Sequence, residues 1–167
     1  MLGLLAMTLA AFCAPPLILA GDVGGAGTRA WLKEGDLLVG TPDAPGRPGV
    51  RPLVSEAALV LPDDLTGWTP LGEACAEDPA ATAKIDDTDV TAAVSVDPTG
   101  KQIVRLQAGE LILAERVLAR PATICQIVIA QADTLPGPEL LILWRLGDNA
   151  DDLRGVTVFR IPETARY

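Results

Sequence analysis

The stretch TAAVSVDPTGKQIVRLQ, residues 91–107, decides the fold class. On each side of its centre, apolar and polar side chains alternate, as in a strand with one buried face. The central Asp97-Pro98-Thr99-Gly100 is a turn sequence, because proline suits the first central position and glycine tolerates the left-handed conformation. The stretch therefore predicts an antiparallel β-hairpin with a short turn.

Other strand signals flank this hairpin, and turn sequences rich in Gly, Pro and Asp separate them. The clearest is LLILWRL at 140–146, which is almost wholly apolar. Only 110–119, rich in Leu, Ala, Glu and Arg, suits a helix as well as a strand. Short strands joined by turns predict an all-β, mainly antiparallel domain, a small sandwich or barrel-like fold with little helix. The further expected strands are 31–39, 53–61, 68–75, 122–130 and 156–161.

The N-terminal segment 1–20 has no charged side chain, and its apolar run ends before Pro15-Pro16. Ile18-Leu19-Ala20 places a small residue directly before Gly21, as signal-peptidase cleavage requires. We therefore expect a signal peptide at 1–20, although no Lys or Arg precedes the apolar run. The alternatives are an uncleaved membrane anchor and a buried N-terminal element of a cytosolic protein.

The rest of the chain divides by composition. Residues 21–52 are rich in Gly and Pro, and we expect them to form a flexible lead-in. Residues 53–167 hold most of the strand signals and form the expected β-rich globular domain. A chain of 167 residues suits one such domain.

Three cysteines are present, and Cys13 lies inside the expected signal peptide. Removal of the signal peptide leaves two cysteines, Cys75 and Cys125, and this even number allows them to pair. Export to an oxidising compartment favours a disulfide between them, since such bonds persist outside the cytosol. Closing a loop of this length is worth roughly 4 kcal/mol in the chain-entropy model. Two buried free thiols are the alternative.

The charge balance restricts the partners. The net charge is −9 with a pI of about 4.4, and no run of Lys or Arg occurs. Nucleic acids and anionic membranes are therefore poor partners, because both are bound through basic patches. Abundant Ala, Gly, Pro and Arg are typical of GC-rich bacterial genomes. We expect a periplasmic or secreted bacterial protein, with a membrane-anchored form as the alternative.

The residue inventory offers little catalytic chemistry. The chain has no histidine, which excludes the Ser-His-Asp and Cys-His arrangements and removes the commonest metal ligand. Acidic clusters in loops are the remaining candidates, and Asp148, Asp151 and Asp152 are the best calcium ligands among them. Trp68 lies in a loop-like segment and is the one candidate for a binding contact. No cofactor is expected.

These observations favour an exported, non-enzymatic β-domain with an accessory or structural role, or one that binds another envelope or secreted protein. Several edge strands would permit contacts by strand addition. The alternative is a carboxylate-dependent hydrolase or a calcium-dependent ligand-binding domain. Two carboxylates that converge in one cleft would favour that alternative.

Overall fold

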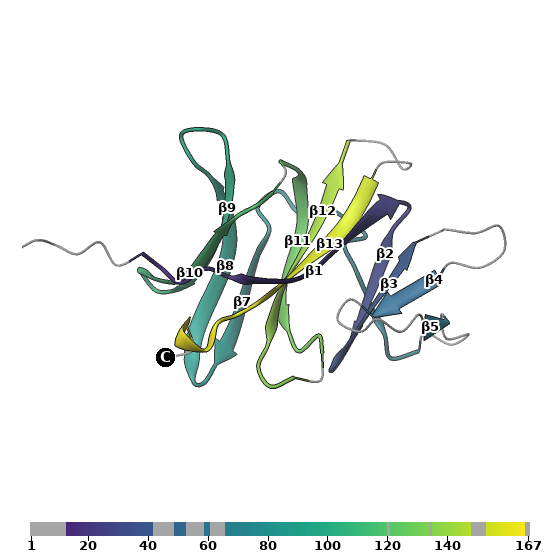
Figure 1. Ribbon diagram of the computed structural model, residues 1–167, viewed down its shortest axis with the longest axis horizontal. Helices are drawn as coiled ribbons and strands as arrows, with labels where there is room; N and C mark the ends of the chain where they lie inside the picture. Colours follow the sequence, from purple (N-terminus) through teal and green to yellow (C-terminus); the bar gives the residue numbers. More distant parts are fainter. Residues whose placement is uncertain are drawn as a thin grey trace, which may run out of the picture.

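The computed structural model describes residues 13–41, 49–52, 59–60, 66–119, 121–133, 135–147 and 153–165. Three sheets of antiparallel strands lie side by side (Figure 1). Sheet A has the order β10-β9-β8-β7, sheet B the order β1-β13-β12-β11, and sheet C the order β5-β4-β3-β2-β6. The elements are β1 (Ile18–Ala26), β2 (Arg29–Lys33), β3 (Asp36–Thr41), β4 (Gly49–Pro52), β5 (Leu59–Val60), β6 (Thr69–Leu71), β7 (Ala80–Ile85), β8 (Thr88–Val96), β9 (Gln102–Ala108), β10 (Leu111–Val117), β11 (Thr123–Ala130), β12 (Glu139–Leu146), β13 (Leu153–Arg160) and the 3-10 helix η1 (Glu163–Ala165).

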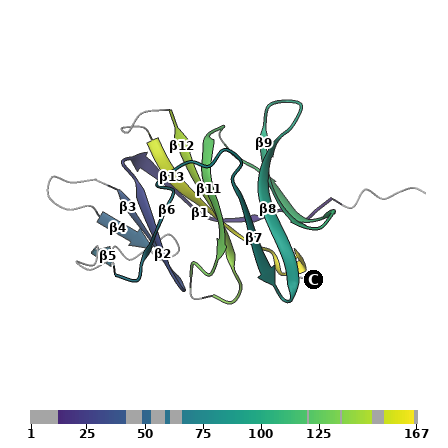
Figure 2. The ribbon, with the colours of Figure 1, turned by 180° about the vertical axis from the view of Figure 1, so that it is seen from behind.

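Sheet B is the middle layer, with sheet A on one side and sheet C on the other (Figures 1 and 2). Leu140 and Ile142 of β12 pack into the apolar cluster shared with sheet A. Leu141 and Leu143 pack into a second cluster, shared with sheet C. Burial on both faces explains why this strand is almost wholly apolar. The prediction of an all-β, antiparallel, sandwich-like domain is confirmed, and the sandwich has a third layer.

The hairpin predicted at 91–107 is confirmed as β8 and β9. Ala92 pairs with Leu106, and both are fully buried. At the turn, the N–H of Gly100 donates to the Asp97 carbonyl at 2.9 Å, and Gly100 has a φ of 85°. The Asp97 carboxylate accepts hydrogen bonds from Thr99, and the hydroxyl bond is the main reason why the pKa of Asp97 is lowered. The turn sequence therefore acts as its composition predicts.

The ambiguous segment 110–119 forms a strand. Its central part is β10, which pairs with β9 along an antiparallel ladder. A bulge interrupts this pairing between Ile112 and Ala114. Leu113 and Ala114 are both buried in the cluster shared with sheet B. This packing outweighs the high helix propensity of the segment, so the segment forms a strand.

The segment before β1 is part of the fold. Pro16 forms a parallel bridge with Glu115 of β10, and the N–H of Leu17 donates to the Glu115 carbonyl at 3.2 Å. Leu17 is fully buried in the core, and the chain then crosses to the edge of sheet B as β1. Cleavage before Gly21, which stays a prediction, would remove Leu17 and the first residues of β1. Among the described residues, no helix is long and apolar enough to cross a bilayer.

Residues 21–52, expected as a flexible lead-in, contain most of sheet C. β2, β3 and β4 follow one another in antiparallel pairs within this range. Ala30, Leu37 and Val39 from these strands are buried against sheet B. The segment therefore supplies the third layer of the domain.

Candidate functional site

The predicted pair of cysteines forms a disulfide. β11 carries a bulge, and Cys125 is its extra residue between Ile124 and Gln126 in the pairing with β12. Cys75, in the connection from β6 to β7, is bonded to it. The N–H of Ala76 donates to the Cys125 carbonyl at 3.0 Å. The disulfide thus fastens the connection between sheets C and A to the edge of sheet B.

Of the other predicted site residues, only Trp68 lies in the described part of the chain. Trp68 is half-buried just before β6, and the Lys33 ammonium lies 5.7 Å from its ring centroid. Asp148, Asp151 and Asp152 lie outside the described residues, so the calcium site stays a prediction. Within the described ranges, no group of three or more Cys, Asp or Glu side chains is arranged to hold a metal ion.

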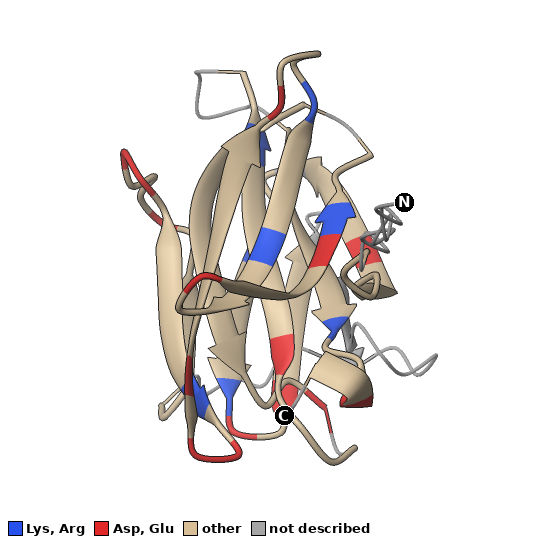
Figure 3. Ribbon diagram, turned by 90° about the vertical axis from the view of Figure 1, so that its left-hand side faces the viewer, with Lys and Arg blue, Asp and Glu red and all other residues tan. Residues whose placement is uncertain are grey.

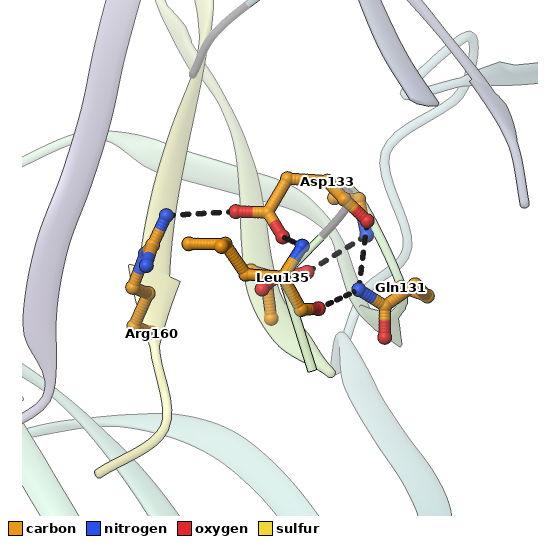
Figure 4. A network of polar contacts seen from close by, with 6 residues as sticks. Gln131, Asp133, Leu135 and Arg160 are labelled. Atoms are coloured by element: carbon orange, nitrogen blue, oxygen red, sulfur yellow. Dashed lines mark hydrogen bonds and ion pairs between the residues drawn. The ribbon is translucent and has the colours of Figure 1, made fainter. Parts of the chain in front are cut away.

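Two buried carboxylates, Asp133 and Glu139, converge at the turn between β11 and β12, and Figure 4 shows the bonds made by Asp133. Asp133 and Glu139 are only 8% and 3% exposed. Asp133 accepts hydrogen bonds from Arg160 at 2.8 Å and from the N–H of Leu135 at 2.7 Å. Glu139 accepts one from the N–H of Ala132 at 2.8 Å. These bonds hold the turn against β13, so the pair is built as a structural network.

This network predicts an unusual pH dependence. Burial raises the pKa of Glu139 above its ordinary value of 4.5, and the nearby Asp133 carboxylate adds to the rise. The fold therefore favours the protonated form of Glu139, so the contribution of this residue to stability falls as the pH rises from 4.5 through its folded pKa. Glu139→Gln keeps the shape of the protonated carboxyl and cannot titrate. We expect urea unfolding to show that the variant gains stability relative to wild type as the pH rises.

The exposed Glu163 of η1 offers a matched control. Glu163→Gln makes the same chemical change without removing a buried charge, so its stability curve should run parallel to that of the wild type. A Glu139→Gln curve that also runs parallel would contradict the structural role assigned to Glu139.

A cavity of about 110 Å³ lies between sheets A and B, where β10 ends and β11 begins. Nine of its twelve lining residues are apolar. For scale, an engineered apolar cavity of roughly 150 Å³ takes up benzene. The space therefore suits much of one apolar side chain. The lining residues are Leu19, Asp22, Arg116, Val117, Leu118, Ala119, Ala122, Ile124, Trp144, Leu146, Thr157 and Phe159.

The indole of Trp144 forms a fixed wall of this cavity. Gly24 and Gly155 face one another in the pairing of β1 with β13. A Cβ atom at either position would overlap the six-membered ring of Trp144. The two glycines therefore let the ring lie flat against the sheet, and the Nε1 of Trp144 donates to the Thr157 hydroxyl at 3.0 Å.

The polar groups of the cavity are engaged within the protein. The Thr157 hydroxyl donates onward to the Asp22 carboxylate at 3.0 Å. Arg116 donates to the carbonyl of Leu17 at 3.0 Å. The lining residues include no serine, cysteine, lysine or histidine. The arrangement is therefore suited to holding an apolar group rather than to acid–base or nucleophilic chemistry.

The rim of the cavity is apolar and lies along a sheet edge. Leu19 of β1 is 47% exposed, and Val117 at the end of β10 is 49% exposed. Within the described ranges, β1 pairs with β13 alone, so its outer edge has no strand partner. Acidic residues, red in Figure 3, lie mainly in the turns at the strand ends. The edge of β1, the rim and the cavity are therefore one continuous candidate site.

Sequence reasoning missed this site because its residues come from five separate segments. Leu19 falls in the expected signal peptide, and Thr157 and Ala122 carry no motif. The glycines at 24 and 155 gave no signal either, because neither lies in an expected strand, and only the structure places them in β1 and β13.

Comparison with protein-family models, with curated proteins and with solved structures finds no match. The candidate site therefore rests on its own geometry.

Proposed function

We propose that the chain is an exported, non-enzymatic binding domain whose partner is another envelope or secreted protein. The observation that carries this proposal is the open edge of β1 beside an apolar cavity. A partner segment in extended conformation would pair with β1 and place one apolar side chain in the cavity. Main-chain hydrogen bonds would supply affinity, and the cavity would supply specificity.

The geometry of β1 supports strand addition. Leu19 and Asp22 point to the cavity, and their register partners are Phe159 and Thr157 of β13. Alternate side chains of a strand added beside β1 would point to the same face. The exposed side chains of Leu19 and Val117 would be covered by a peptide, whereas a small free molecule would leave them in water.

The disulfide supports the exported location, because such bonds form and persist in oxidising compartments. Leu17 is fully buried and its backbone pairs with β10. We therefore propose that processing leaves Leu17 on the mature chain, with the leader ending before Pro15.

The binding site can be tested with a library of displayed random peptides. We expect the selected peptides to carry apolar residues at alternate positions. Ala122 lines the cavity, so Ala122→Phe should fill it and weaken the binding of these peptides at least about tenfold, which is about 1.4 kcal/mol. Binding is measured by calorimetry on purified wild type and variant.

Thr82→Phe is the matched control, because Thr82 is exposed on β7, at the edge of sheet A. This variant adds the same phenyl group away from the cavity and should bind the peptides as the wild type does. Selected peptides that bind Ala122→Phe undiminished, or a library that yields no binder, would overturn the proposal.

A further inference from the structure

A second hollow, of about 250 Å³, lies beside the start of β2 and is separate from the cavity described above. Its lining residues include two arginines, Arg29 of β2 and Arg154 of β13. Trp31 and Pro70 line it as well, and these two residues face each other in the pairing of β2 with β6. The hollow thus combines positive charge with an apolar wall.

A tight turn brings the two arginines together. Gly25 of β1 pairs with Arg154, and the chain then turns at Thr28 directly into Arg29. The Thr28 hydroxyl donates to the Gly25 carbonyl at 3.0 Å, and the backbone N–H of Thr28 donates to the same oxygen. The local hydrogen bonds therefore place Arg29 next to the strand that carries Arg154.

The side chains of Arg29 and Arg154 differ from those of four other cations of the described chain. Lys84, Arg105 and Arg160 each form an ion pair with a carboxylate, and Arg116 donates to a backbone carbonyl. Within the described ranges, no carboxylate lies within ion-pair distance of Arg29 or Arg154. Two unpaired guanidinium groups on one hollow, in a chain with a net charge of −9, indicate a site for an anion.

The residues that line the hollow indicate which class of anion it would bind. Glu73 lines the same hollow, and its negative charge disfavours doubly charged phosphate or sulfate more than a singly charged group. Trp31 and Pro70 favour an organic ligand with an apolar part next to its charge. The Trp31 ring lies against β3, because a Cβ at Gly40 would be 3.2 Å from it.

We propose that this hollow binds an organic carboxylate, through Arg29 and Arg154, with the apolar part of the ligand against Trp31. The carboxylate is either that of a free small acid or the C-terminus of a peptide. Arginine recognises both in the same way, by paired hydrogen bonds to the two oxygens. The site is distinct from the edge of β1, so it does not depend on the proposed function.

The test uses the full oxidised chain and three probes: N-acetylphenylalanine, an N-acetylated tetrapeptide ending in phenylalanine with a free carboxylate, and inorganic phosphate. Binding is followed by NMR shifts of the Arg29 and Arg154 side chains. We expect both carboxylates to bind more tightly than phosphate, and the C-terminal amide of each organic probe to bind at least about tenfold more weakly. A tetrapeptide that binds more tightly than the free acid would assign the site to peptide ends, and the reverse order to small acids.

Arg29→Gln and Arg154→Gln should each weaken carboxylate binding at least about tenfold. Arg29 is exposed, so its variant is expected to fold normally even where the Arg154 variant loses stability. Arg105→Gln removes the same charge on sheet A, where Arg105 is paired with Glu115, and should bind as the wild type does. The proposal would be overturned if the C-terminal amides bind as tightly as the acids, or if phosphate binds most tightly. It would also be overturned if Arg29→Gln binds the carboxylates as tightly as the wild type does. Ala122→Phe, which blocks the other site, should leave this binding unchanged.

Discussion

Replacing Gly155 by alanine is expected to unfold most of the domain or to lower its free energy of unfolding by roughly 3 kcal/mol or more. The added Cβ would overlap the Trp144 ring and would lie 2.5 Å from the carbonyl oxygen of Val23. The ring lies over both Gly24 and Gly155 and its Nε1 is bonded to Thr157, and the carbonyl belongs to the paired strand β1, so relieving the overlap would break existing contacts. Thermal and urea unfolding followed by circular dichroism measure the loss.

Gly100→Ala controls for the general effect of replacing a glycine. Gly100 has a φ of 85° but no atom within 4 Å of an added Cβ, so only backbone strain is expected, about 1 kcal/mol. Gly24→Ala makes contact mainly with Trp144, and its cost should therefore shrink in a Trp144→Leu background. If Gly155→Ala is no worse than Gly100→Ala, Trp144 does not lie where the structure places it.

Removing the disulfide is expected to cost roughly 4 kcal/mol of unfolding free energy, because the bond closes a loop across a separation of 50 residues. The double substitution Cys75→Ala/Cys125→Ala should show this loss in urea unfolding, and a reducing agent should produce a similar loss in the wild type. Cys13→Ser, made in the full unprocessed chain, is the control, since Cys13 is an exposed free thiol, and it should have little effect. A wild type whose unfolding midpoint does not respond to reduction would contradict the bond.

The same cysteines report on export. Expressed with its own N-terminal segment in a Gram-negative host, the chain should be recovered from the periplasm with Cys75 and Cys125 oxidised. Its intact mass should place the mature N-terminus before Leu17. A chain that stays in the cytoplasm with an intact Met1 and reduced thiols would contradict the exported location.

Local signals predicted the hairpin at 91–107 and the strands in the C-terminal part of the chain, but not β1, β4 or β7. The alternation at 91–107 and the turn sequence at its centre act over a few residues, so no distant contact is needed to interpret them. The disulfide was also predictable, from the parity of the cysteines and the apolar leader. The bulge that makes Cys125 an extra residue of β11 was not predictable. A bulge changes which face the side chains point to, and no sequence motif marks it.

The third layer and the candidate site depend on contacts between distant segments. The apolar run 140–146 indicated a buried strand, but only the packing of 21–52 against it shows why both faces are apolar. The glycine-rich composition of 21–52 favoured a flexible segment, and this preference was outweighed by burial of Leu37 and Val39. The cavity likewise brings together Leu19 and Trp144, which lie far apart in the sequence, and no local pattern predicts such a contact.

Hydrogen exchange on β1 is the most direct test of the binding account. Backbone amides of Ile18–Ala26 and of β7 are compared in the free protein and with a saturating peptide selected from the displayed library. With the peptide bound, we expect slower amide exchange along the outer edge of β1, where added hydrogen bonds would form. Amide exchange along the edge of β7 should stay unchanged. Protection on β7, or none on β1 while the peptide is bound, would contradict it.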